Sequence, residues 1–412
     1  MRFGSILFAN GAGDATTESP APPACLADLN LDQVIEAITA GRQEYHLHPF
    51  FYTPLHDADA IYYRHEVMRD LEDETLLESI KAFAQQMVVV RRYLALAEKL
   101  DFKHHIAGWR LEAANLYCET VAGLARRLEA ANLRSRGLIA FRAYLSDYIH
   151  TPTFVALAGE AQKIKADLAA IQYCVIIRGS TVRVRKYEGE EDYSAEVEKT
   201  FEKFKQGAVK DYRIFRPERA GLNHVEGRIL DCVARLYPQV FARLHAFCER
   251  HSQFLDETIR VFDREIQFYV AYLEFIARLR KAGLRFCYPH IVTTKDIAAR
   301  DTFDIALANK LCEEKAPIIC NDFYLQGRER IFIVSGPNQG GKTTFARTFG
   351  QLHYLASLGC PVPGQEARLY LYDRLFTHFE RQEDIKNLRG KLQDDLVRIH
   401  AALERCTPDS IL

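Results

Sequence analysis

Residues 336–343 (GPNQGGKT) match the spacing G-x-x-x-x-G-K-[ST] at every fixed position. Glycines in such a run let successive backbone N–H groups turn around phosphate oxygens without interference from a Cβ atom. Lys342 reaches toward the β and γ phosphates of a nucleotide, and the Thr343 hydroxyl is placed to bind Mg²⁺. The pattern therefore predicts a phosphate-binding loop with ATP and Mg²⁺ as its ligands.

The segments on either side of this run fit the elements that a phosphate-binding loop needs. Residues 331–334 (IFIV) form a short β-branched and aromatic run, which predicts a buried parallel strand. From Phe345 to Leu358 the apolar residues have helical spacing, and Gly359 follows as a favourable residue to end a helix. The N-terminus of that helix would add its partial positive charge to the phosphate site.

Hydrolysis requires an acidic residue at the end of a neighbouring strand as well as the loop. Apolar spacing over 392–403 predicts a helix, and Ser410 to Leu412 have the composition of an opening strand. Asp394 and Asp395 fall on that helix, where a solvated face is their simplest interpretation. We therefore expect the acidic residue to lie beyond Leu412, and expect the chain as given to hydrolyse ATP poorly or not at all.

Long helices are predicted at two places far apart in the sequence. Apolar residues recur at alternating spacings of four and three over 76–94 and over 255–276. The second run follows a shorter helical pattern over 225–236, which Pro238 should end. We interpret these runs as lever-like helices that pack together in a bundle, rather than as a zipper for a partner.

A change to strand periodicity interrupts the helical region at residues 173–187. Residues 182–185 alternate between valine and arginine, and Gly179 with Ser180 suits a two-residue hairpin turn. The predicted polar face carries four basic residues: Arg178, Arg183, Arg185 and Lys186. Two interpretations stay open, a solvated edge strand that resists aggregation and a patch that contacts DNA phosphates.

Composition limits the class of protein. The 412 residues include 54 Lys and Arg against 55 Asp and Glu, a net charge of −1, which excludes a globally basic nucleic-acid binder but not a local patch. Ten cysteines occur without a C-x-x-C pair, so no structural zinc site is predicted. No apolar run approaches the ~20 residues of a membrane span. We expect a cytoplasmic protein with no membrane partner.

These elements predict a mixed α and α/β fold, in which a long helical core and lever bundle with a small β-containing insertion precedes a partial P-loop domain; resemblance to a known family implies that the insertion is a clamp and that the domain is an ATPase of the ABC type. The expected ranges are a disordered tail at 1–25, a helical core and lever at 26–150, a clamp-like insertion at 151–222, returning lever helices at 223–290, and a P-loop ATPase domain at 291–412 that is incomplete at its C-terminus.

Several segments resemble one known family. Residues 336–344 are similar to the GPNMGGKST nucleotide loop of the MutS DNA mismatch-repair family, and residues 358–363 and 373–377 resemble its I-G-S-Y-V-P and D-R-I-F-T stretches. Residues 57–71 are similar to the family's core and lever region. Ile318 and Ile319 lie where the family has the apolar pair that stacks on the adenine ring.

The resemblance implies an ATP-binding protein that binds double-stranded DNA and forms a homodimer through its ATPase domains. The residues before the core are too few for the family's N-terminal mismatch-recognition domain, and its Walker B strand would follow Leu412. The alternatives are a P-loop ATPase that acts on a protein partner and a non-catalytic, nucleotide-gated scaffold. The resemblance implies these nucleotide-binding residues: Gly336, Pro337, Asn338, Gln339, Gly340, Gly341, Lys342, Thr343 and Thr344. It also implies that Ile318 and Ile319 contact the adenine base.

Overall fold

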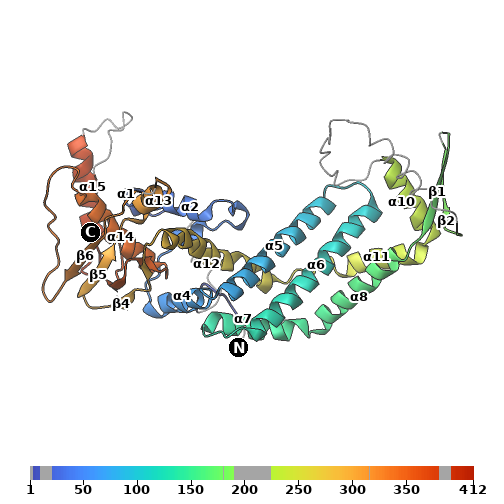
Figure 1. Ribbon diagram of the computed structural model, residues 1–412, viewed down its shortest axis with the longest axis horizontal. Coiled ribbons are helices and arrows are strands. Elements are labelled where there is room, and N and C mark those ends of the chain that lie inside the picture. The colour runs from blue at the N-terminus through green and yellow to red at the C-terminus, as the bar shows by residue number, and fades with distance from the viewer. Residues whose placement is uncertain (1–2, 10–20, 180, 190–223, 315, 380–390) are drawn as a thin grey trace, which may run out of the picture. The chain divides into compact units, whose positions relative to one another are not determined.

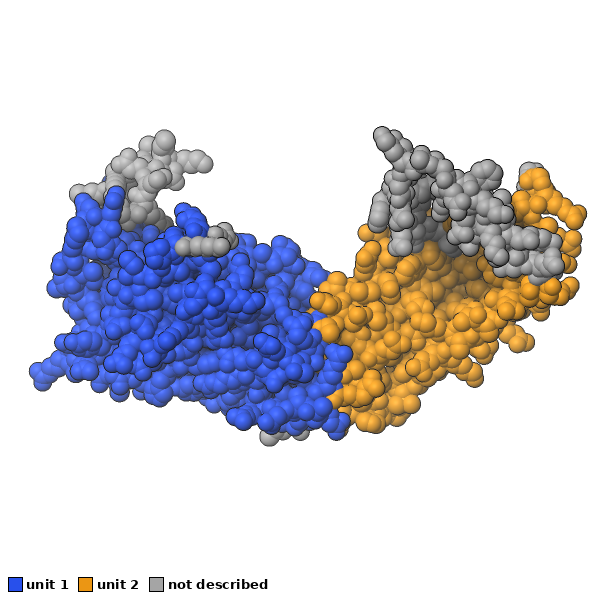
Figure 2. Space-filling view, in the orientation of Figure 1, with its two compact units in different colours: residues 1–81, 127–145, 257–412 blue, residues 82–126, 146–256 orange. Residues whose placement is uncertain are grey.

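The computed structural model describes residues 3–9, 21–179, 181–189, 224–314, 316–379 and 391–412 (Figure 1). The chain forms two compact units, shown in blue and orange in Figure 2. Unit 1 comprises residues 1–81, 127–145 and 257–412, and unit 2 comprises residues 82–126 and 146–256. Each unit is therefore built from stretches that are far apart in the sequence.

Unit 1 contains short N-terminal helices, one long central helix and the small sheets. Its helices are α1 (Cys25–Asp28), α2 (Leu31–Thr39), α3 (His48–Phe51), α4 (Ala58–Asp70), α12 (Glu257–Lys281), α13 (Ile305–Glu314), α14 (Lys342–Ser357) and α15 (Lys391–Arg405), with a 3₁₀ turn at Gln43–Tyr45. Its strands are β3 (Phe286–Cys287), β4 (His290–Val292), β5 (Ile297–Thr302), β6 (Asn321–Leu325), β7 (Val362–Pro363) and β8 (Glu366–Tyr370).

The larger sheet of unit 1 has the order β4-β8-β5-β6. β4 and β8 are parallel, whereas β5 is antiparallel to both β8 and β6. β3 and β7 form a separate antiparallel pair. In β6, Phe323 and Leu325 are buried and Tyr324 between them is exposed, so the sheet buries one face of this strand.

Unit 2 is mostly helical with one hairpin. It contains most of α5 (Glu74–Ala97) and α6 (Lys103–Ala130), the end of α7 (Arg136–Ile149), α8 (Pro152–Ala169), β1 (Tyr173–Arg178), β2 (Thr181–Lys186), α10 (His224–Leu236) and α11 (Pro238–Arg250). Pro238 is the first residue of α11, so the predicted break after the shorter helical pattern is confirmed.

The predicted apolar seams are confirmed as buried helix faces. On α5, Leu76, Ile80 and Val90 are buried, and α12 buries its seam residues from Ile259 to Ile276. The Phe262 ring stacks on Phe141 of α7 with centroids 3.6 Å apart. Burying one such side chain contributes about 1.5–3 kcal/mol, so α12 organises the core of unit 1.

The expectation of a disordered tail over 1–25 is wrong for residues 3–9. Ile6 and Leu7 are fully buried. The Ser5 hydroxyl donates to the Glu265 carboxylate on α12 at 2.8 Å, and the Ile6 amide donates to the same group at 2.8 Å. Burial raises the pKa of Glu265 despite these bonds. A short apolar segment with one buried polar anchor is enough to order this end of the chain. Residues 10–20 lie outside the described residues.

The predicted buried strand at 331–334 is also wrong. The structure gives this segment no strand, and the side chains of Ile331 and Ile333 are 80% and 91% exposed. A strand requires a hydrogen-bonded neighbour, and none of the described strands pairs with this segment. Side chains of this segment still alternate between outward and inward, because Phe332 turns inward and lies 5.9 Å from Phe323 between ring centroids.

The opening strand predicted at 410–412 forms one bridge. Ile411 pairs in parallel with Leu375, and its carbonyl accepts from the Phe376 amide at 2.8 Å. Residues 391–405 are helical, as expected. The DRIFT-like segment and this strand opening therefore lie side by side.

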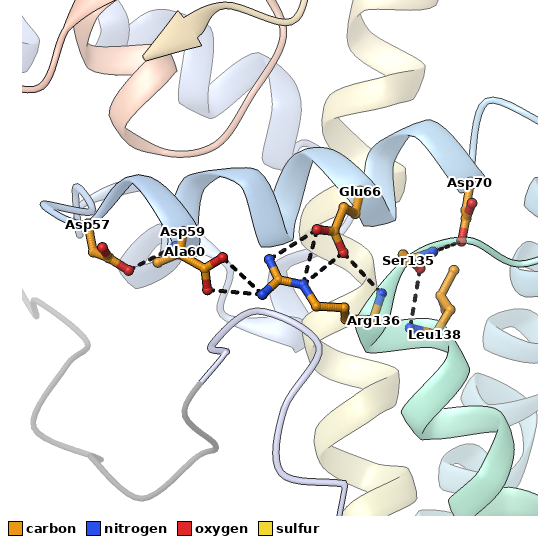
Figure 3. A network of polar contacts seen from close by, with 8 residues as sticks. All are labelled: Asp57, Asp59, Ala60, Glu66, Asp70, Ser135, Arg136 and Leu138. Carbon is orange, nitrogen blue, oxygen red and sulfur yellow. Dashed lines mark hydrogen bonds and ion pairs between the residues drawn. The ribbon is translucent and has the colours of Figure 1, made fainter. Parts of the chain in front are cut away.

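Acidic side chains of α4 hold the start of α7 (Figure 3). Arg136 contacts Asp59 at 2.9 Å and Glu66 at 3.0 Å, and its backbone amide donates to Glu66. The Asp70 carboxylate accepts from the Ser135 amide at 2.8 Å. These carboxylates bind the unsatisfied N–H groups that begin α7 and complement its positive end.

None of the described helices is long and apolar enough to cross a membrane.

Two histidines join α6 to α11 inside unit 2. His245 Nε2 and His104 Nδ1 are 2.9 Å apart, so one ring donates a hydrogen bond to the other. Burial lowers the pKa of both rings, and the neighbouring positive groups lower it further, while Asp231 opposes this for His104 and Glu249 for His245. The folded state therefore binds fewer protons than the unfolded chain near and below the ordinary histidine pKa, ~6.5.

We expect stability to be full above about pH 6.5 and to fall as the pH drops through the lowered histidine pKa values. Replacing His245 with glutamine keeps a neutral hydrogen-bonding group but removes one titrating ring. In His245→Gln the number of protons taken up on unfolding at acidic pH should therefore fall by about one, and the unfolding free energy should depend less steeply on pH. Denaturant titrations at pH 5 to 8 test this, with fluorescence of the single tryptophan, Trp109 on α6, as the probe. The matched control is His150→Gln at an exposed position; equal pH slopes in both variants would contradict the assignment.

Candidate nucleotide-binding site

The backbone of the predicted loop has the turns that bring N–H groups to one side. Gly336 has φ 154°, Gly341 has φ 83°, and Gln339 adopts the left-handed region at φ 65°. The Gly340 amide donates to the Pro337 carbonyl at 3.1 Å, which closes a tight turn. A left-handed conformation at a non-glycine residue costs about 1–2 kcal/mol, so Gln339 places local strain in the loop.

The interior of the loop is open. A Cβ atom added at Gly336 or Gly341 would meet no atom within 4 Å, so conformation rather than crowding requires glycine there. At Gly340 an added Cβ would lie 3.0 Å from the Pro337 carbonyl oxygen. All residues from 335 to 341 are exposed. The backbone of the loop is therefore accessible from solvent.

Helix α14 begins directly at the lysine of the loop. Its first intrahelical bond runs from the Phe345 amide to the Gly341 carbonyl at 2.9 Å. The amides of Lys342, Thr343 and Thr344 precede that bond and are the unsatisfied donors of the helix N-terminus. The Lys342 ammonium donates to the carbonyls of Gly336 and Pro337, each at 2.7 Å, so the lysine folds over the loop that it is predicted to serve.

These residues fit the phosphates of a nucleotide with Mg²⁺. Exposed amides, a helix N-terminus and a lysine are the donor set that binds phosphate oxygens. Lys342 would hold the β and γ phosphates, and the exposed Thr343 hydroxyl would bind Mg²⁺. Bound Mg²⁺ would neutralise charge that develops on the phosphates.

The far end of α14 is fixed by a glycine turn. The Cys360 amide donates to the Leu355 carbonyl and the Gly359 amide to the Ala356 carbonyl, which is the Schellman arrangement. Gly359 has φ 72°, as its position after the predicted helix indicates. Arg64 of α4 is fully buried and donates to the Leu358 carbonyl at 2.8 Å. A cation at the C-terminus of α14 complements the helix dipole.

An aromatic cluster links the start of α14 to β6 and to the segment before the loop. Phe332 lies 6.1 Å from Phe345 and 5.6 Å from Phe349 between ring centroids, and Phe349 lies 4.4 Å from His353. Burial lowers the pKa of His353 to about 4, so its ring is neutral at physiological pH. The cluster lines a cavity of about 640 Å³.

The predicted base-contacting pair is less enclosed than the loop. Ile318 is half-buried and the side chain of Ile319 is 80% exposed. Both follow α13, a helix that begins beside α14. Their position against an adenine ring stays a prediction.

The predicted DNA-binding residues do not share a single face. β1 and β2 pair antiparallel with Arg178 opposite Thr181 and Tyr173 opposite Lys186, so the two-residue turn is confirmed. Arg178, Arg183 and Arg185 lie on one face. Placing Lys186 with them is wrong, because adjacent residues of a strand point to opposite faces. Its ammonium lies 5.3 Å over the Tyr237 ring. Residues 190–223, which include Lys203, Lys205 and Lys210, lie outside the described residues.

Comparison with known proteins identifies the C-terminal segment. The family described as MutS domain V matches residues 332–412. The DNA mismatch repair protein MutS of Chloroflexus aurantiacus is 29% identical over 197 residues, which is 46% of this chain and 19% of the relative. The Thermosipho melanesiensis MutS is 32% identical over 94 residues, 23% of this chain and 12% of the relative. The Thermotoga MutS is 23% identical over 210 residues, which is 50% of this chain and 25% of the relative.

The loop, the helix that follows it and these matches together define a P-loop ATPase domain. Residues 332–412 match domain V of the MutS family, its ATPase domain. The fold is mixed and mostly helical with small sheets, as expected at that level. The aligned parts span a quarter or less of the length of these curated relatives.

The sequence analysis missed the buried polar residues that hold α14. Residues 350–357 of this helix are all buried, and they include Gln351 and His353. A signal existed in the sequence: Gln351 lies four residues before Leu355, at the spacing of the buried face. Its partners, however, are at positions 29, 304 and 305, which periodicity does not reveal.

Replacing Lys342 with alanine should weaken nucleotide binding at least tenfold. The substitution removes a charge-assisted contact worth roughly 1.5–3 kcal/mol. Isothermal titration with ATP and Mg²⁺ measures the effect, with the exposed Lys99→Ala as the charge-matched control. Equal affinity of the wild type and Lys342→Ala would remove the lysine from the site.

Proposed function

We propose that this chain is an ATP-binding protein that also binds double-stranded DNA, with ATP binding coupled to dimerisation and DNA clamping. The single observation that carries the nucleotide part is the open loop at 336–341, whose turns lead into a helix N-terminus with Lys342 beside it. The match to MutS domain V over the same residues supports ATP as the ligand.

Each loop residue has a role in this proposal. The amides of residues 339 and 341–344 would bind phosphate oxygens, Lys342 would neutralise the β and γ phosphates, and Thr343 would bind Mg²⁺. Ile318 and Ile319 would contact the base. The loop places its donors before the nucleotide arrives, so binding requires little rearrangement of the backbone.

The DNA part of the proposal is supported by the arginine face of the hairpin and by the relatives. The proteins matched in Chloroflexus and Thermotoga are named as DNA mismatch repair proteins. Arg178 and Arg183 are exposed, and Arg185 is half-buried with Glu188 3.9 Å away. Arginines on one face of a twisted strand pair suit the phosphates of a duplex. The proposed dimer forms through the ATPase domains.

A second candidate function is an ATPase that acts on a protein partner. The opposite face of the same hairpin exposes apolar side chains, with Ile177 70% exposed, Tyr173 45% and Val182 39%. Such a face suits a protein surface better than a phosphate backbone. The two functions differ in which face of the hairpin they use, so a charge reversal separates them.

Reversing Arg183 and Arg185 to glutamate should lower duplex affinity and flatten its salt dependence. Each lost phosphate contact removes about 0.9 from the slope of log K against log salt concentration. Fluorescence anisotropy with a labelled duplex over a salt titration measures both quantities. The control is Arg260→Glu with Arg278→Glu on α12, which changes the net charge equally. Unchanged binding by the hairpin variant would favour the protein-partner function.

A further inference from the structure

A glutamine of the nucleotide helix is buried with its amide bonded to other segments. The side chain of Gln351 is fully buried. Its Nε2 donates to the Leu29 carbonyl at 2.8 Å and to the Asp304 carboxylate at 2.8 Å, and its Oε1 accepts from the Ile305 amide at 3.0 Å. Both donors of the amide and one acceptor site are therefore satisfied.

This set of bonds fixes more than the helix itself. A buried amide that loses its partners is unfavourable by about 1–3 kcal/mol, so α14 has one favourable register against these segments. The neighbouring Gly350 enforces the same register, because an added Cβ would lie 2.6 Å from the Leu29 side chain. Rotation or sliding of α14 would break all three bonds together.

Two of the three partners of Gln351, Asp304 and Ile305, form the start of α13. Asp304 accepts from the amides of Ala306 at 2.9 Å and Leu307 at 3.0 Å, so it caps the first turn of this helix. Ile305 is the first residue of α13, and Ile318 and Ile319 follow the helix. The amide of Gln351 thus joins the helix that carries the phosphate loop to the helix that leads to the base-contacting pair.

Two helical segments meet at Gln351, and they have similar lengths: α13, and the part of α14 between Lys342 and Gln351. α13 has 10 residues, about 15 Å at the helical rise. Gln351 lies nine positions after Lys342 on α14, or about 13.5 Å along the helix. A rotation of about 10° at this junction would move the far end of such a segment by about 2.6 Å. A displacement of that size separates a base from its contact while the phosphate loop stays intact.

We propose that Gln351 is a positioning residue that sets the distance between the phosphate loop and the base-contacting segment, and so determines recognition of the nucleoside part of ATP. This inference rests on the proposed nucleotide-binding function. Inorganic tripolyphosphate has the phosphates without the base and ribose. It therefore uses the loop but not the distance that Gln351 fixes.

The test compares the affinities of ATP and tripolyphosphate, each with Mg²⁺, for the full chain. Gln351→Leu keeps the approximate volume and removes all three bonds. We expect it to weaken ATP binding about tenfold, a loss of ~1.4 kcal/mol, and to leave tripolyphosphate affinity within about twofold, a difference of ~0.4 kcal/mol. Gln351→Glu places a second carboxylate beside Asp304 and should weaken ATP similarly. Adding Asp304→Asn supplies a new donor and should restore much of the ATP affinity.

Tyr354→Phe is the matched control. Tyr354 lies on the same helix and is also buried, but its hydroxyl donates to the Phe51 carbonyl of α3 at 2.8 Å. It should lower the unfolding midpoint without changing the ratio of the two affinities. Equal loss of ATP and tripolyphosphate binding in Gln351→Leu, or no rescue by Asp304→Asn, would overturn the positioning role. Absence of binding of either ligand by the wild type would instead contradict the proposed function.

Discussion

The buried polar contacts along α14 are the constraint on which the nucleotide site depends. The first turn of the helix is half-buried apart from the exposed Thr343, whereas its last two turns are buried, so each polar side chain on the buried part needs a partner. Arg347 donates to the Asp28 carbonyl, Gln351 to Leu29 and Asp304, and Tyr354 to Phe51. All of these partners lie before residue 332. The segment that matches domain V therefore depends on earlier parts of the chain for its placement.

Stability and binding are divided between the two ends of this helix. The N-terminal end has an open loop, a left-handed Gln339 and a lysine that bonds to loop carbonyls. The C-terminal end has a glycine turn and a buried arginine, Arg64, that donates to the Leu358 carbonyl. Strain at an exposed binding loop is tolerated when the element behind it is held firmly. The loop is free to suit its ligand because the helix is not free to move.

Local patterns predicted the helices, the hairpin and the phosphate loop, because each depends on residues close in sequence. The same patterns failed at 331–334, where an apolar run had no hydrogen-bonded neighbour, and at residues 3–9, where Ser5 meets Glu265 across the whole chain. Lys186 lies on the face opposite the three arginines because side chains alternate along a strand, and a group of basic residues close in sequence does not by itself share a face. The partners of Gln351 depend on tertiary packing, which one sequence without a fold does not reveal. The motif predicts the class of ligand, and the packing shows which residues position the helix behind the loop.

The two sides of α4 differ in how ions in solution affect them. On one side Arg64 is fully buried and bonds to backbone carbonyls, and on the other Arg136 is 47% exposed in its contacts with Asp59 and Glu66. Exposed pairs contribute only about 0.2–1 kcal/mol each, and salt screens them over ~8 Å at physiological strength. Buried contacts escape this screening. Raising the ionic strength therefore weakens the ion pairs between α4 and α7 and leaves the buried contact of Arg64 with the end of α14 unchanged. Salt thus weakens the packing of α4 on one of its two sides.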